Sequence, residues 1–201
     1  MAYVTRTYVK TANSIPAADT SQDDLIDQYI TAVQAWIDNY CHRTFETTTA
    51  TKLHDYKRSD ILWLRDDLYS LTTFTNGDSE VLTENTHFYL RPYGGPPYQW
   101  VEMEPTSGKL LQYTTTPLRA ISVAGDWGFS ETAPAIIQAA AAAWIGSLVS
   151  QASLSGVASM SMAGYSVSFR GPDAERPCEP PATVAQMLKP YIRRRPRGFM
   201  P

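Results

Sequence analysis

Non-polar residues recur at three- and four-residue steps in three stretches of the chain, which is the period of an amphipathic helix. The pattern predicts helices near residues 22–41, 134–150 and 182–193. The middle stretch contains an uninterrupted alanine run, Ala139–Ala143, and small side chains let a neighbouring backbone approach closely. We therefore expect a central packing helix there. Pro190 should kink or shorten the last helix.

Between the first two helices, short β-prone runs alternate with turn signals. The runs fall at 47–51, 61–64, 68–75, 88–90, 100–103 and 109–113. Asn76-Gly77-Asp78 is a signal for a hairpin turn. We interpret residues 46–125 as a mostly antiparallel β region inserted into a small helical bundle. The predicted fold class is α+β.

A further strand is expected from Ile121, followed by Gly125-Asp126-Trp127-Gly128. Glycine adopts positive φ at no steric cost, so the two glycines predict a tight turn that ends this strand. The large aromatic Trp127 is expected to be buried in that structural turn.

The remaining segments show little regular pattern. Residues 1–19 are expected to form an extended arm, and residues 151–181 an irregular loop or hairpin with one strand near 165–169. We interpret residues 1–193 as a single domain, and residues 194–201 as a basic C-terminal tail.

Composition narrows the function classes. A net charge of −3 gives no overall attraction to nucleic acid or anionic lipid. No non-polar run reaches the ~18 residues of a membrane span, and the N-terminus lacks a signal-peptide core. Cys41 and Cys178 are too far apart in sequence for a zinc knuckle or a disulfide framework. We expect Cys41 to be a small buried hydrophobe, and the protein to be made in the cytosol.

Candidate catalytic residues are few. The three histidines show no metal-ligand spacing, and we expect no metal or cofactor. Asp66 and Asp67 are adjacent acids, expected to be solvated in a loop. Asp126 is the best single catalytic candidate, although a turn-forming aspartate explains it equally well. A small hydrolase that uses Asp126 or the Asp66/Asp67 pair stays as an alternative, because catalytic groups can assemble from distant residues.

Several short motifs follow one another in a fixed order along the chain. They are Ile37-Asp38-Asn39-Tyr40-Cys41-His42-Arg43-Thr44-Phe45, Ala124-Gly125-Asp126-Trp127-Gly128-Phe129, Pro134-x-Ile136-x-x-Ala139, Ala163-Gly164-Tyr165-Ser166-Val167-Ser168 and Leu188-x-x-Tyr191-x-Arg193. This ordered set resembles the head–tail connector (adaptor, neck) proteins of long-tailed double-stranded DNA bacteriophages, over most of residues 20–193. The bulk of residues 46–120 departs from the compact helical members of that family.

The resemblance implies a structural virion protein without catalysis or a cofactor. Such adaptors form a ring, typically of twelve subunits, under the portal protein at the head–tail interface. They extend the channel through which double-stranded DNA passes without sequence-specific binding, and they dock the next neck or tail protein. The subunits are made in the host cytoplasm, and no membrane is involved. A stopper or tail-completion protein of the same neck is the alternative structural role.

Four arginines lie in the last nine residues of the chain, at positions Arg193, Arg194, Arg195 and Arg197. They can form a solvated charge run, or they can pair with carboxylates in the two-pronged geometry that suits arginine. Tight phosphate binding would obstruct DNA passage, so we expect the tail to dock onto an acidic face of the portal. Members of the resembled family use their C-terminal segment in this way.

Overall fold

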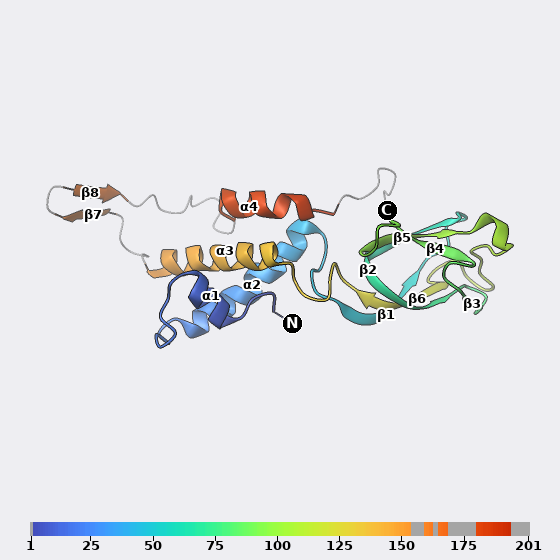
Figure 1. Cartoon of the computed structure of the whole chain (residues 1–201), viewed down its shortest axis with the longest axis horizontal. Helices are drawn as coiled ribbons and strands as arrows, with labels where there is room; N and C mark the ends of the chain where they lie inside the picture. Colours follow the sequence, from blue (N-terminus) through green and yellow to red (C-terminus); the bar gives the residue numbers. More distant parts are fainter. Residues whose placement is uncertain (1, 154–158, 163–164, 169–179, 194–201) are drawn as a thin grey trace. The chain divides into compact units, whose positions relative to one another are not determined.

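A computed structural model describes residues 2–153, 159–162, 165–168 and 180–193 (Figure 1). The chain divides into two compact units. Residues 42–134 form a β unit, and the described residues before and after them in the sequence form a helical unit. The fold class is α+β, as the sequence predicted. Whereas the sequence was interpreted as one domain, the inserted β region is a unit of its own with its own non-polar core.

The helical unit is built around α3 (Ala135–Ser153). This helix contacts α1 (Arg6–Ala12), α2 (Asp23–Cys41) and α4 (Ala182–Leu188), which lie beside it in Figure 1. The bounds of α2 match the periodicity closely. Its buried residues recur on one face, at Ile26, Ile30, Val33, Ile37 and Cys41.

The central helix α3 is non-polar around most of its circumference because three helices pack on it. Its alanine run is largely buried, and Ile137 and Ile145 are fully enclosed. By length and composition alone the segment Ala135–Ala152 could cross a membrane, with a mean hydropathy of 1.3. Core helices have the same composition, and the packing of α1, α2 and α4 on α3 is that of a core helix. The expectation of a central packing helix is confirmed.

The extended arm predicted for residues 1–19 is wrong, because this segment contains α1. Thr5 caps the helix by accepting a hydrogen bond from the Tyr8 N–H at 3.2 Å. Val9 is completely buried, and the Lys10 ammonium forms an ion pair with Asp23 at 2.5 Å. Seven residues are too few to show a helical period, and the tertiary contacts of Val9 and Lys10 stabilise the helix.

Two further features belong to the chain after α3. Strands β7 (Ser159–Met162) and β8 (Tyr165–Ser168) pair in antiparallel register. The last α-helix ends at Leu188, and a 3-10 turn, η2 (Lys189–Tyr191), contains Pro190. The predicted shortening by this proline is confirmed, because proline removes a backbone donor and crowds the preceding turn.

The β unit is a six-stranded antiparallel sheet in the order β1-β6-β2-β5-β4, with β3 paired to β2. Its strands are β1 (Thr48–His54), β2 (Ile61–Thr75), β3 (Val81–Leu82), β4 (Phe88–Arg91), β5 (Tyr98–Met103) and β6 (Ile121–Trp127). A 3-10 turn, η1 (Pro105–Ser107), follows β5. The core includes Leu68, Phe74, Phe88, Val101 and Val123. Alternate residues of the strands therefore face this core, as a half-buried antiparallel sheet requires.

Two strand predictions need correction. The runs at 61–64 and 68–75 are one 15-residue strand, β2, whose register with β5 shifts between Trp63 and Leu68. No strand forms at 109–113, because the Asn76 side chain holds this segment in an irregular path. Its amide donates to the Leu110 carbonyl at 2.9 Å and accepts from the Gln112 N–H at 3.1 Å.

The chain enters and leaves the β unit at one end of the sheet. Thr48 pairs with Trp127 at that end. Just outside this pair, the Phe129 N–H donates to the Thr44 carbonyl at 2.9 Å, and a further backbone bridge joins residue 46 to residue 130. The entering and leaving segments are thus fastened to each other.

The opposite end of the sheet, which we call the loop end, is where His54 pairs with Ile121. The segments 55–60, 76–80 and 109–120 connect strands there. Backbone hydrogen bonds tie them together, from Tyr56 N to Pro117 O at 2.7 Å and from Gly77 N to Gln112 O at 3.1 Å.

Candidate functional site

The predicted tight turn at Gly125–Gly128 is wrong. Strand β6 continues through Trp127, and neither glycine has positive φ. A Cβ atom on Gly125 would lie on the Ser70 carbonyl oxygen, and one on Gly128 on the Glu46 carbonyl oxygen. The glycines are therefore explained by the close approach of neighbouring backbones rather than by a turn. Trp127 is buried as expected, and its indole N–H donates to the Ala50 carbonyl at 2.9 Å.

Asp126 lies on β6, between β1 and β2, and joins the three strands. Its carboxylate accepts hydrogen bonds from the Ser70 hydroxyl at 2.6 Å and the Thr49 hydroxyl at 2.5 Å. These two donors, Ser70 first, hold the pKa of the Asp126 carboxyl below its usual value. A carboxylate stabilised in its charged form is a weak general base at neutral pH. The geometry is that of a structural clasp.

The two acids Asp66 and Asp67 are adjacent in strand β2, but they do not form a carboxylate pair, because the first is exposed and the second is buried. Asp66 is exposed and forms an ion pair with Lys52 at 2.7 Å. Asp67 is buried and lies 3.4 Å from the Arg43 guanidinium. The prediction of two solvated loop acids is wrong for Asp67. Simple alternation from the buried Leu62 and Leu64 would have placed Asp66 inside, and the irregularity between Trp63 and Leu68 reverses that assignment.

The histidines and Cys41 lie in the part of the chain that the structure describes, and they were considered as possible ligands or reactive groups. Among the residues that the structure describes, no group of three or more His, Cys, Asp or Glu could hold a metal ion. Cys41 is fully buried in α2, as predicted, and Cys178 lies outside the described residues. His54 is buried with its ring 5.9 Å from that of Trp127, and burial lowers the pKa of its imidazole to about 4.

The basic tail is described only at its first residue. Arg193 is 9% exposed, and its backbone N–H donates to the Cys41 carbonyl at 2.9 Å, so this arginine is part of the helical unit. Arg194, Arg195 and Arg197 lie outside the described residues, and their docking role stays a prediction.

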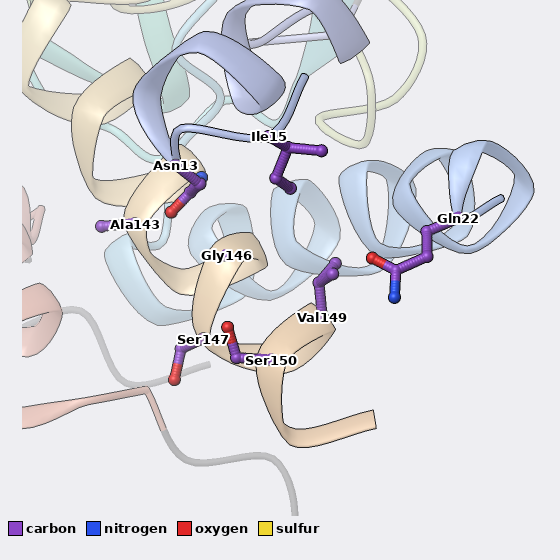
Figure 2. Close-up of a pocket in the computed structure, with 8 residues that line it drawn as sticks. All are labelled: Asn13, Ile15, Gln22, Ala143, Gly146, Ser147, Val149 and Ser150. Carbon is purple, nitrogen blue, oxygen red and sulfur yellow. The ribbon is translucent and has the colours of Figure 1, made fainter. Parts of the chain in front are cut away.

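The helical unit carries an open groove of about 610 Å³, between the segment that joins α1 to α2 and one face of α3 (Figure 2). The groove is lined by Asn13, Ile15, Gln22, Ala143, Gly146, Ser147, Val149 and Ser150. None of these side chains is an acid, a base or a thiol. The groove offers hydrogen bonds and van der Waals contact, and its lining supplies no group for acid–base catalysis.

Sequence reasoning missed a non-polar surface at the loop end of the β unit. Val81, Leu110 and Leu118 are each 60–65% exposed there, and Tyr113 is 43% exposed. Leu110 lies in the segment that was expected to be a strand and is a loop instead, and this loop leaves Leu110 and Leu118 exposed. Exposed non-polar patches of this kind mark interaction surfaces.

No protein-family model and no curated protein matches the sequence. Solved structures do match the fold. A chain from the neck of an empty gene transfer agent (GTA) particle, computed with C6 symmetry, matches with a TM-score of 0.57 at 12% identity. The match covers 99% of this chain and 94% of that one. The chain shares its fold with a GTA neck protein.

Two more structures support the neck-protein fold. A chain from the neck of the native GTA particle, computed with C12 symmetry, matches at 14% identity and a TM-score of 0.51, over 98% of this chain and 97% of that one. A chain from the virion of the native GTA particle matches at 12% identity with a TM-score of 0.55. This match covers 96% of this chain and 92% of that one. The resemblance to head–tail connectors, first drawn from short motifs, is confirmed at the level of the fold. Both units are included in the match, because it spans nearly the whole chain.

Proposed function

We propose that this protein is a structural subunit of a phage-like neck, which forms a ring and acts as the adaptor between the portal and the next neck or tail protein. The observation that carries the proposal is the end-to-end match to chains from GTA necks computed with C6 and C12 symmetry. A cyclic ring needs two different complementary patches on each subunit. The groove of the helical unit and the non-polar loop end of the β unit are candidates for such patches.

In this proposal the ring holds twelve subunits, lies at the head–tail interface of the virion and lengthens the DNA channel. The role is mechanical, and it needs no metal, cofactor or catalytic group. The acids that sequence reasoning considered for a hydrolase support a structural role, because Asp126 joins three strands and Asp66 and Asp67 form ion pairs with different cations.

Electron microscopy of the purified protein mixed with its portal tests the proposal. The expected image is a ring of subunits stacked coaxially on the portal. A stable small dimer that leaves the portal bare would contradict it. If the ring does not form on the portal alone and forms only when a different protein already occupies the portal as its adaptor, a stopper or tail-completion role would be favoured.

The arginine-rich tail is proposed to make the portal contact, because four arginines can pair with carboxylates on an acidic face. Removing residues 194–201 should leave the fold intact and should abolish capture of the portal in a pull-down. The matched control is the double variant Arg58→Gln and Arg119→Gln, which removes two exposed arginines of the β unit and should bind normally.

Equal portal capture by the truncated protein would reject the docking role of the tail. A parallel mobility-shift assay with double-stranded DNA separates the remaining possibility. Salt-sensitive DNA binding that disappears on truncation would assign the tail to the channel wall instead.

A further inference from the structure

Five aromatic side chains come from β2, β5, β4 and the segment that follows β4, in the part of the sheet that ends at the β4 edge. We call this group the aromatic patch, and it consists of Trp63, Tyr89, Tyr93, Tyr98 and Trp100. Trp63 and Trp100 are directly opposite each other on β2 and β5, with ring centroids 4.8 Å apart. The rings of Tyr89 and Tyr93 are 6.0 Å apart. Tyr93 is 67% exposed, and the other four are half-buried.

Three of these aromatic residues line a small pocket of about 120 Å³ beside β4. The pocket is formed by Glu84, Asn85, Tyr89, Leu90, Tyr93 and Tyr98. It is large enough for part of one side chain. Tyrosine is enriched at protein interfaces because its ring supplies contact area at a low entropic cost while its hydroxyl stays wet.

Carboxylates surround the patch. Glu84 lies in the pocket wall, the Glu104 carboxylate accepts a hydrogen bond from the Tyr89 hydroxyl, and Glu102 is opposite Tyr89 across the β4–β5 ladder. Arg91 is the cation within the patch, and it forms an ion pair with Glu102 at 2.6 Å. Glu84 and Glu104 therefore leave the surroundings of the patch with an excess of negative charge.

The patch already binds one guanidinium within the chain itself. The Arg91 guanidinium carbon lies 3.3 Å from the centroid of the Tyr93 ring, in cation–π geometry, and the same guanidinium forms the ion pair with Glu102. Tyr93 is nevertheless 67% exposed, so ring surface beyond the Arg91 contact is open to a second cation from another molecule.

We infer that the aromatic patch is a docking site for a polypeptide segment of a partner protein, in which arginine or lysine stands beside proline or another non-polar residue. The cation stacks on the exposed Tyr93 near the carboxylates, and the non-polar neighbour enters the pocket. Nucleic acid is the wrong chemistry, because phosphates would approach two carboxylates and a single, already paired arginine. The inference rests on the proposed function only in assigning the segment to another neck protein.

The test uses the full-length protein and two synthetic peptides, Arg-Pro repeated six times and Gln-Pro repeated six times, in titration calorimetry at physiological salt. The arginine peptide should bind, and the glutamine peptide should not. Tyr93→Ser and Glu84→Gln should each weaken arginine-peptide binding by about threefold to tenfold, the scale of one cation–π or charged contact. The matched control is Tyr113→Ser, which removes a partly exposed tyrosine at the loop end and should bind like the wild type.

Circular dichroism of each variant checks that it is folded, and Tyr93→Phe should restore binding because it keeps the ring. Equal binding by the Tyr93→Ser and wild-type proteins would overturn the inference, as would loss of binding only in Tyr113→Ser. Binding of a double-stranded oligonucleotide that Tyr93→Ser abolishes would overturn it in favour of nucleic acid. None of these results depends on portal capture, so a failure here and a failure of the neck role can be told apart.

Discussion

Gly125 shows how one missing side chain fixes the distance between strands. It lies in the middle of β6, directly opposite Ala50 on one neighbour and Leu71 on the other. Any Cβ atom at this position would meet the carbonyl oxygen of Ser70, which belongs to the backbone and cannot rotate away. The close contact brings the hydroxyl of Ser70 within reach of Asp126. One glycine therefore supports the clasp across three strands.

Gly125→Val should destabilise the protein by about 1–3 kcal/mol or more, because an overpacked site forces the strands apart. Denaturant unfolding followed by tryptophan fluorescence measures the change. Ala124→Val is the control, since it adds the same branched side chain one residue earlier, on the other face of β6. An unchanged midpoint for Gly125→Val would show that β2 and β6 can separate without cost.

His54 makes stability depend on pH. Burial lowers its pKa to about 4, whereas an exposed histidine titrates near 6.5. Between these values the unfolded chain binds the proton and the folded chain does not, so stability should fall as the pH falls from about 6.5 to about 4. The loss from this residue alone should reach at most about 3 kcal/mol. Urea unfolding at several pH values measures it.

The substitution His54→Phe keeps a buried ring beside Trp127 and removes the titration, so the stability of this variant should change less across the same pH range. His42→Asn, at an exposed residue with positive φ that asparagine tolerates, should keep the wild-type profile. Parallel profiles for the His54→Phe and wild-type proteins would mean that other groups cause the pH dependence.

At the scale of elements, α1 is held against α3 by one polar contact. The Asn13 side chain donates to the Val9 carbonyl at 2.9 Å and to the Ala142 carbonyl at 3.0 Å, and so joins the end of α1 to the middle of α3. A Cβ atom on Gly146 would occupy the position of the Asn13 amide. Figure 2 shows Asn13 and Gly146 together in the wall of the groove.

Gly146→Leu should displace Asn13 and loosen α1, with a loss of about 1–3 kcal/mol. Hydrogen exchange of the α1 amides should speed up more than that of the α2 amides. Ala143→Leu, at an exposed position one turn earlier on α3, should leave α1 protected. Unchanged exchange in Gly146→Leu would show that the buried Val9 and the Lys10–Asp23 ion pair are sufficient to hold α1.

The long elements were predictable because their signal is local. The bounds of α2 follow from its non-polar periodicity, α3 was located by its long non-polar and alanine-rich run, and the core-facing alternation of β4 and β5 follows from their sequence. Short or tertiary features were not predictable. The helix α1 depends on an ion pair to Asp23, and the path of 109–113 depends on the distant Asn76. The β6 glycines were misread because a turn and a close strand contact demand the same residue.

The candidate surfaces were less accessible to sequence reasoning than the fold. The aromatic patch draws Trp63, Tyr89 and Trp100 from three strands, and only the register of β2, β4 and β5 brings them together. The surroundings of the two acids were likewise set by the fold, because Asp66 is exposed and Asp67 is buried in the same strand. The basic tail could be recognised from the sequence alone, because four of the five residues 193–197 are arginines.

At the scale of the whole molecule, we expect the free protein to be a monomer or a loose oligomer that closes into a ring only on the portal. The exposed leucines of the loop end and the polar groove of α3 are modest surfaces, and interfaces of this kind are stabilised by a template. Light scattering should give a small mass for the free protein and a ring's mass after addition of portal. The variant Leu110→Ser with Leu118→Ser should lower ring formation without changing the melting temperature, because both residues are exposed.

A ring already complete in the free protein would contradict this order of assembly. Leu53→Ser, which replaces an exposed leucine on β1 rather than in the loop 109–120, is the matched control and should assemble normally. If Leu53→Ser disrupted the ring while the double variant did not, the subunit contact would belong to the β1 edge of the sheet instead.

The fastening between residues 44–46 and 129–130 has a consequence for the history of the gene. Because the two ends of the β unit are tied by backbone hydrogen bonds, the DNA encoding residues 45–129 can act as a cassette. Recombination between related genes would then remove, enlarge or replace the β unit, and the flanking segments would still meet the same two closely spaced ends. Compact helical connectors and this larger subunit would then differ by one exchange rather than by gradual growth.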